Sequence, residues 1–147
     1  MVRKTILIID DSEIDKLMLE NILLCDYFVE TAENGFKGME LILHGDKKID
    51  CILLDLHMPI MDGFGVLELL KDSNISDIPV IIISAESTSE NLFKSFSFNA
   101  ADFICNLLNR RQSLKESPPR LKRKSDHSIY FFISVCSTTL FPRRVIA

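Results

Sequence analysis

Four short apolar runs stand out along the chain, and none of them alternates with polar residues. They occupy residues 6–9, 51–54, 80–83 and 103–105. Continuous apolar runs of this length, rich in isoleucine, are typical of strands that are buried on both faces, as in a parallel sheet. A weaker run at residues 27–31 predicts one more strand.

Helical patterns separate these runs. The first helix follows Ser12, which is placed to cap it. Its expected buried face consists of Ile14, Leu17, Met18, Ile22 and Cys25. Further helices are expected around residues 36–43, 66–70 and 92–96, and a fifth from about 107 to 116, before two prolines at 118–119 end it. Of Phe93, Phe96 and Phe98, at least two are expected in the core.

The order of strand and helix, repeated five times, determines the expected fold class. It predicts an α/β domain with a parallel sheet and right-handed crossovers. In open sheets of this kind the working site lies at the carboxyl ends of the strands. The residues that follow each apolar run are therefore the candidates for function.

Acidic side chains follow two of the predicted strands. Asp10 and Asp11 come after the first strand, and Asp55 comes after the third. If these strands are neighbours, the three carboxylates converge, and one of them must take up a proton or share a cation. Oxygen ligands without thiolate or imidazole suit Mg²⁺. A magnesium ion beside a carboxylate nucleophile is a setting for phosphoryl transfer.

Several segments resemble the receiver domain of two-component response regulators. They are ILIIDDS at 6–12, AENG at 32–35, LLDLHMPIMDG at 53–63 and IPVIIISA at 78–85. Together, in this order, these motifs are far more specific than any one of them alone. The resemblance implies a flavodoxin-like fold with a doubly wound, five-stranded parallel sheet in the order 2-1-3-4-5. We expect the receiver domain to span residues 1–117.

The resemblance also implies a role for each acidic residue. Asp55 matches the phosphoacceptor, which takes a phosphoryl group from a histidine kinase or a histidine phosphotransfer protein. Asp10 and Asp11 match the acidic pair that, with Asp55 and the backbone carbonyl of His57, holds Mg²⁺. Such a domain catalyses only its own phosphorylation and dephosphorylation, so we expect no enzyme that acts on an external substrate.

Three further positions concern the response to phosphorylation. Ser84 and Phe103 match the hydroxyl and aromatic switch residues of the family, whose downstream protein targets dock on the fourth helix, fifth strand and fifth helix. Asn106 departs from the family, which has a lysine at this position. Asparagine can orient a phosphate oxygen but cannot neutralise it, so we expect weaker retention of the phosphorylated state and weaker coupling to the switch.

Other interpretations remain open. Because of Asn106, the chain could be a pseudo-receiver that binds protein partners without phosphorylation. A phosphatase with an aspartyl-phosphate intermediate is a third class. Asp10 and Asp11 with Ser12, or Ser84, could also serve only as helix caps. Capping does not explain Asp55, since a carboxylate at the end of a buried strand needs a charge partner.

Charge is distributed unevenly. The chain has a formal net charge of −4, but residues 1–106 carry 8 Lys or Arg and 19 Asp or Glu, and residues 107–147 carry 9 and 2. The formal net charge is therefore −11 for residues 1–106 and +7 for residues 107–147. We expect residues 118–147 to form a basic and apolar tail without a separate domain, and in particular without a DNA-binding domain, because about 30 residues rarely fold alone.

Three interpretations of the tail stay open. It is a basic arm for nucleic acid or an anionic membrane, a membrane-associating segment, or a sequence without selected function, such as a disrupted reading frame that begins near Asn106. Residues 128–142 are uncharged, but this stretch is shorter than the about 20 residues of a membrane span. We expect no transmembrane span.

The four cysteines form no CxxC pair and no zinc-site spacing. The N-terminal apolar run is too short for a signal peptide, since Asp10 and Asp11 interrupt it. Both observations favour a reducing compartment, and we expect the cytoplasm.

Overall fold

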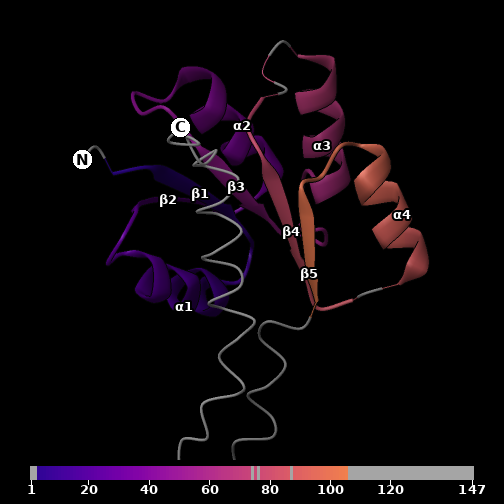
Figure 1. The fold of residues 1–147 in the computed structure, drawn as a ribbon, viewed down its shortest axis with the longest axis horizontal. Coiled ribbons are helices and arrows are strands. Elements are labelled where there is room, and N and C mark those ends of the chain that lie inside the picture. The colour runs from indigo at the N-terminus through magenta and orange to yellow at the C-terminus, as the bar shows by residue number, and fades with distance from the viewer. Residues whose placement is uncertain (1–2, 74, 76, 87, 106–147) are drawn as a thin grey trace, which may run out of the picture.

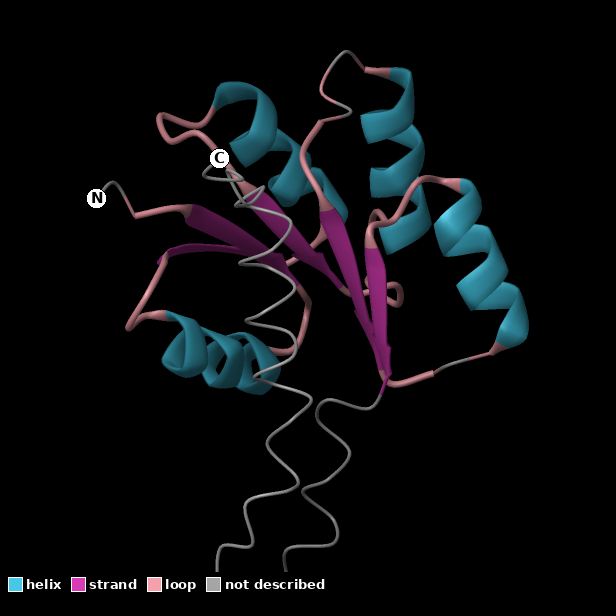
Figure 2. Ribbon diagram, in the orientation of Figure 1, coloured by secondary structure: helices cyan, strands magenta, loops and turns pink. Residues whose placement is uncertain are grey.

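The structure of the 147-residue chain is a computed structural model, which describes residues 3–105 except 74, 76 and 87. Strands and helices alternate along it (Figures 1 and 2). The strands are β1 (Thr5–Ile9), β2 (Phe28–Ala32), β3 (Cys51–Leu54), β4 (Val80–Ser84) and β5 (Asp102–Cys105). The helices are α1 (Glu13–Leu23), α2 (Gly35–His44), α3 (Gly63–Asp72) and α4 (Ser89–Ser97). The predicted fifth helix lies outside the described residues.

The five strands form one parallel sheet in the order β2-β1-β3-β4-β5. This confirms the predicted fold class and strand order, and each predicted strand is found to within one residue at either end. Ile9 of β1 pairs with Leu54 of β3, and Leu54 pairs with Ile82 of β4. The carboxyl ends of β1 and β3 therefore meet at the same edge of the sheet.

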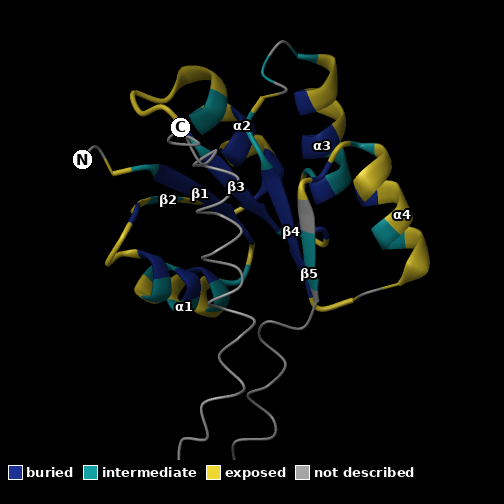
Figure 3. Ribbon diagram, viewed as in Figure 1, coloured by how far each residue is buried: buried dark blue, intermediate teal, exposed yellow. Residues whose placement is uncertain are grey.

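Two apolar clusters lie on opposite faces of the sheet. Leu7, Ile52 and Ile82 face the cluster that includes Val66 and Leu67 of α3. The opposite cluster holds Ile6, Ile8, Leu53, Ile81 and Ile83 of the strands, with Leu19 and Leu23 of α1. Among the described helices, α2, α3 and α4 cover one face and α1 covers the other (Figure 1). Burial on both faces is the reason that the strands do not alternate between apolar and polar residues (Figure 3).

Each described helix begins at a polar cap, and the cap fixes where the chain turns away from the sheet. The Ser12 side chain accepts a hydrogen bond from the Asp15 N–H, as predicted. Asn34 and Asp62 cap α2 and α3 in the same way, and Thr88 caps α4. No helix in the described part of the chain is long and apolar enough to cross a membrane.

The predicted face of α1 is wrong for Ile14, Leu17 and Cys25, which are exposed, whereas Met18 and Ile22 are half-buried. The helix packs Leu19 and Leu23 against the sheet, whereas Ile14 and Leu17 are 66% and 60% exposed. Two apolar stripes run along this helix, and spacing alone favoured the one with more members. Lys16 is also buried along its stem, with its ammonium group 2.6 Å from the Glu13 carboxylate.

The expected burial of the α4 phenylalanines is also wrong. Phe93 and Phe96 are 79% and 50% exposed, and only Phe98 packs against the core. The buried residue of this helix is Ser95, whose hydroxyl donates to the Asn91 carbonyl at 2.7 Å. A short polar residue lets the helix approach the sheet closely, and the larger rings are left outside.

Candidate functional site

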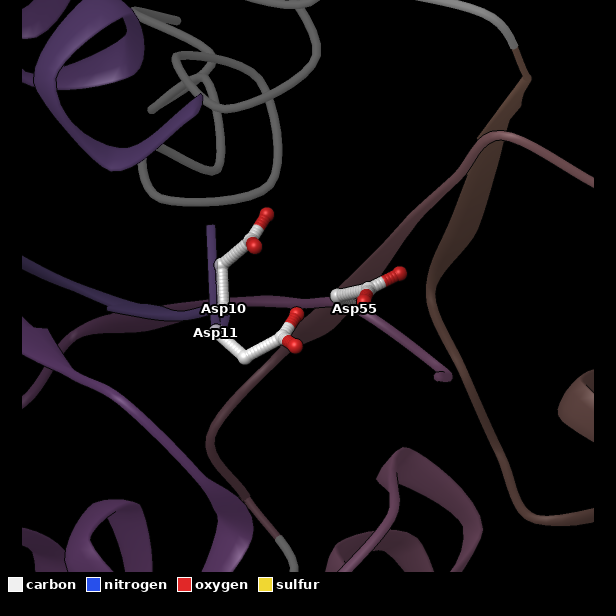
Figure 4. A group of neighbouring side chains, drawn as sticks. All are labelled: Asp10, Asp11 and Asp55. Carbon is white, nitrogen blue, oxygen red and sulfur yellow. The ribbon is translucent and has the colours of Figure 1, made fainter. Parts of the chain in front are cut away.

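Three aspartates from two neighbouring strands meet at the carboxyl edge of the sheet (Figure 4). Asp10 and Asp11 follow β1, and Asp55 follows β3. The backbone N–H of Asp55 donates to the Ile9 carbonyl at 2.9 Å, and that of Asp10 donates to the Ala32 carbonyl at 3.0 Å. Both residues therefore continue the ladder of the sheet for one more residue, which fixes where their side chains start.

The side chains of these aspartates come close enough to share an ion. One carboxylate oxygen from each of Asp10, Asp11 and Asp55 lies within 4.8 Å of the others. Asp10 is buried at 5% exposure, Asp55 is half-buried and Asp11 is exposed. The group is thus closed on the side of Asp10 and open to solvent on the side of Asp11.

Burial and mutual repulsion make this group costly to ionise. Burial raises the pKa of Asp10 to about 6, although the Ser12 N–H, which donates to its Oδ1 at 2.8 Å, acts in the opposite direction. Burial also raises the pKa of Asp55, against the hydrogen bonds from the N–H groups of Leu56 and His57. Neighbouring carboxylates raise both values further. A cation among them would relieve both effects.

The donor set fits a hard divalent cation. The grouped ligand atoms are all carboxylate oxygens, without a thiolate or an imidazole. Mg²⁺ binds through a few carboxylates and keeps several waters, which suits a group that is open on one side. The His57 imidazole belongs elsewhere, because its Nε2 lies 3.5 Å from the Glu86 carboxylate of the loop between β4 and α4.

Ser84 ends the strand next to β3. It is 2% exposed, and its Oγ accepts a hydrogen bond from the Glu86 N–H at 3.2 Å. The cap of α4 is Thr88, so Ser84 does not serve as that cap. Its hydroxyl proton is not used in the bond from Glu86, which leaves it available to an acceptor near the strand end.

Phe103 lies on β5, opposite Ile82 of β4 in the register. It is half-buried and packs against the cluster on the α2 and α3 side of the sheet. Asn106 lies outside the described residues.

Lys94, the lysine of α4, holds its ammonium group 4.1 Å from the centre of the Phe64 ring, which keeps it on the α3 side of the helix.

Sequence reasoning missed how the loop after β3 is held. A Cβ on Gly63 would lie 2.4 Å from the Asp55 carbonyl oxygen. The Gly63 N–H donates to the Leu56 carbonyl at 3.1 Å. Glycine at this position thus lets the start of α3 press against the backbone of Asp55. No spacing in the sequence marked this close approach of the two backbones.

The same loop has an unusual residue at its tip. Ile60 has a φ of 70° and is 86% exposed. A β-branched residue in the left-handed region is strained, by about 1–3 kcal/mol. Nothing in the sequence pattern marked this position.

The model of the response regulator receiver domain matches residues 6–116. The chain belongs to this family. Among curated relatives, the two-component response regulator ORR24 of Oryza sativa subsp. indica is 34% identical over 100 residues, which cover 67% of this chain and 16% of the relative. The two-component response regulator ARR12 of Arabidopsis thaliana is 35% identical over 100 residues, with the same coverage. This receiver thus spans 16% of the length of these relatives.

Solved structures agree with the fold of this receiver. The phosphorylated cyanobacterial phytochrome response regulator RcpA has a TM-score of 0.68 and 26% identity, and the match covers 76% of this chain and 86% of that one. CheY4 of Vibrio cholerae has a TM-score of 0.66 at 24% identity, covering 78% and 95%. TrrA of Thermotoga maritima, solved in complex with Mg²⁺-BeF, has a TM-score of 0.63 at 24% identity, covering 75% and 92%.

Proposed function

We propose that this receiver accepts a phosphoryl group on Asp55 from the phosphohistidine of a histidine kinase or a histidine phosphotransfer protein. The observation that carries the proposal is the grouping of the Asp10, Asp11 and Asp55 carboxylates within 4.8 Å. Asp55 is less buried than Asp10, so it is the member that a phosphodonor reaches more easily while remaining next to the other two.

Asp10, Asp11 and Asp55, with the backbone carbonyl of His57, would hold Mg²⁺. When bound, the cation supplies positive charge that offsets the charge on the transferring phosphoryl oxygens. The raised pKa values of Asp10 and Asp55 support this assignment, since burial and the neighbouring carboxylates disfavour their ionised forms and a bound cation would favour them.

In the transfer, a carboxylate oxygen of Asp55 attacks phosphorus in line with the phosphohistidine nitrogen. A new P–O bond forms as the P–N bond breaks, and the leaving imidazole takes up a proton from solvent. The N–H groups of Leu56 and His57, which donate to the Asp55 carboxylate, orient it for this attack.

Phosphorylation then shifts an equilibrium between two conformations. The Ser84 hydroxyl donates to a phosphoryl oxygen while the Glu86 N–H continues to hold its Oγ. Phe103 changes its rotamer, and the surface of α4, β5 and the fifth helix changes its affinity for a downstream protein. Asn106 offers the phosphoryl group no charge, so this state is held less tightly than with a lysine.

We further propose that the receiver domain spans residues 1–117, that residues 118–147 are a tail without a DNA-binding domain, and that the protein works in the cytoplasm on no external substrate. The match covers only 16% of the relatives named above, so the proposal names the class of partner and not their individual partners. A pseudo-receiver, the alternative that Asn106 raises, would not respond to a mimic of the phosphoryl group.

A titration with beryllofluoride and Mg²⁺ tests the proposal, because beryllofluoride mimics an aspartyl phosphate. We expect saturable changes in the amide spectra of Asp55 and Ser84 in the wild type, and none in Asp55→Asn. A spectrum that does not respond to beryllofluoride in the presence of Mg²⁺ would establish the pseudo-receiver instead.

A further inference from the structure

An apolar stripe of α1 faces away from the sheet. Leu17 and the C-cap residue Leu24 follow Ile14 by three and ten residues, and Ile14, Leu17 and Leu24 are 66%, 60% and 48% exposed. These spacings bring the three side chains to one side of the helix axis. Leu19 and Leu23 already pack α1 against the sheet, so the core does not need this second stripe.

A shallow groove of about 230 Å³ runs along this stripe between α1 and β2. It is lined by Glu13, Ile14, Lys16, Leu17, Glu20 and Thr31. Lys16 is paired with Glu13, so its charge is already offset within the groove. The Glu13 carboxylate is 84% exposed. The charged lining residues Glu13, Lys16 and Glu20 sum to −1, so the groove combines apolar side chains with a weakly acidic rim at Glu20, which suits an occupant that is both apolar and basic.

The chain itself contains such an occupant. Four of the five residues 120–124 are Lys or Arg, and nine of the thirteen residues 129–141 are apolar. The net charge of −11 on residues 1–106 is complementary to the net charge of +7 on residues 107–147. Fifteen residues lie between Cys105 and the end of residue 120; with the expected helix at about 107–116 (about 15 Å) and about five further residues extended, they reach about 30 Å, whereas β5 and β2 are four strand spacings, about 19 Å, apart across the sheet. The connection is long enough to bring this segment to α1.

We propose that residues 120–141 dock on the α1 groove of their own chain. The apolar run covers Ile14 and Leu17, and the basic run faces Glu20. The docking itself does not depend on phosphorylation.

Limited trypsin digestion of the full chain tests the docking, since cleavage follows the population of the open form. We expect cleavage after residues 120–124 to be at least about tenfold faster in Ile14→Lys/Leu17→Lys than in the wild type. The substituted positions are exposed, so the fold should tolerate them. The matched control is Phe36→Lys/Leu43→Lys on the outer surface of α2, where exposure is 58% and 51% and cleavage should not change. Equal cleavage in all three proteins would overturn the proposal.

Disulfide trapping with native cysteines provides a second readout. Cys25 is exposed just beyond α1, and Cys136 lies inside the apolar run. Mild oxidation of the full chain should form a Cys25–Cys136 bond within one molecule. Moving the first thiol to α2, in Cys25→Ser/Leu43→Cys, should reduce bond formation at least about tenfold, because effective concentration depends on geometry. Equal trapping from both positions, or a disulfide that links two chains, would overturn intramolecular docking.

Discussion

The backbone N–H of Asp55 donates to the carbonyl of Ile9 at 2.9 Å. This hydrogen bond extends the pairing of β1 and β3 by one residue beyond Ile9 and Leu54. Since Asp10 follows Ile9 directly, the same bond holds two carboxylates of different strands side by side. The site is therefore a consequence of strand order, and its charge repulsion is imposed by the fold.

Replacing Asp10 with asparagine should stabilise the cation-free protein. The pKa of Asp10 rises from 3.8 to about 6 on folding, so its ionisation opposes folding above that range. The gain should be about 1–3 kcal/mol in the free energy of unfolding near pH 7.5, measured by urea denaturation with a chelator present. Asp26→Asn, which removes an exposed carboxylate, is the control and should have little effect. A loss of stability in Asp10→Asn would contradict the conclusion that the ionised Asp10 side chain opposes folding.

The stability difference between wild type and Asp10→Asn should depend on pH. Because the folded pKa is raised, the stabilising contribution of Asp10 is fully present below 3.8 and is lost as the pH rises through about 6. The advantage of the variant should therefore grow from about pH 4 to about pH 6 and then level off. Denaturation at a series of pH values measures this, and an advantage that is constant with pH would rule out Asp10 as its source.

Magnesium should stabilise the wild type and should stabilise the Asp10→Asn and Asp55→Asn variants much less. At about one hundred times its dissociation constant, a ligand specific for the folded state adds about 2.7 kcal/mol. Thermal unfolding with and without Mg²⁺ at fixed ionic strength provides the measurement. An equal shift of the unfolding temperature in all three proteins would locate the ion elsewhere.

Gly63→Ala should destabilise the protein by about 1–3 kcal/mol, because the new methyl group would meet the Asp55 carbonyl at 2.4 Å. Gly65→Ala is a matched control in the same helix. Its nearest neighbour would be the Met61 side chain at 3.1 Å, and alanine favours the helix by about 0.5–1 kcal/mol. Chemical denaturation of both variants tests the contrast, and equal stabilities would show that the contact at Asp55 is easily relieved.

Asn106→Lys should strengthen the binding of beryllofluoride. A charge-assisted hydrogen bond exceeds a neutral one by about 1 kcal/mol, which corresponds to roughly a fivefold change in affinity. Asn109→Lys adds the same charge three residues later in the sequence and serves as the control. Equal affinities in wild type and Asn106→Lys would mean that residue 106 has no part in holding the phosphoryl group.

Much of the fold was predictable because it depends on patterns that repeat along the chain. Strands buried on both faces leave continuous apolar runs, and Ser12 marked the start of α1. The meeting of Asp10, Asp11 and Asp55 followed from the strand order. Local residues thus indicated the elements, and the resemblance supplied their arrangement.

The errors arose where more than one packing satisfied the same pattern. Along α1, Ile14 and Leu17 match helical spacing as well as Leu19 and Leu23 do, and only the sheet determines which stripe is buried. The His57–Glu86 pair joins two loops far apart in sequence, so no local signal could identify it. The close contact at Gly63 likewise depends on a backbone approach that spacing does not encode.

The most direct test of the central claim is phosphorylation of the full chain by a small phosphodonor such as phosphoramidate, with Mg²⁺, followed by intact-mass measurement and peptide mapping. We predict a single phosphoryl group on Asp55, formed only with Mg²⁺ present and absent from Asp55→Asn. Phosphorylation that persists in Asp55→Asn, or a wild type that remains unmodified under these conditions, would contradict the account.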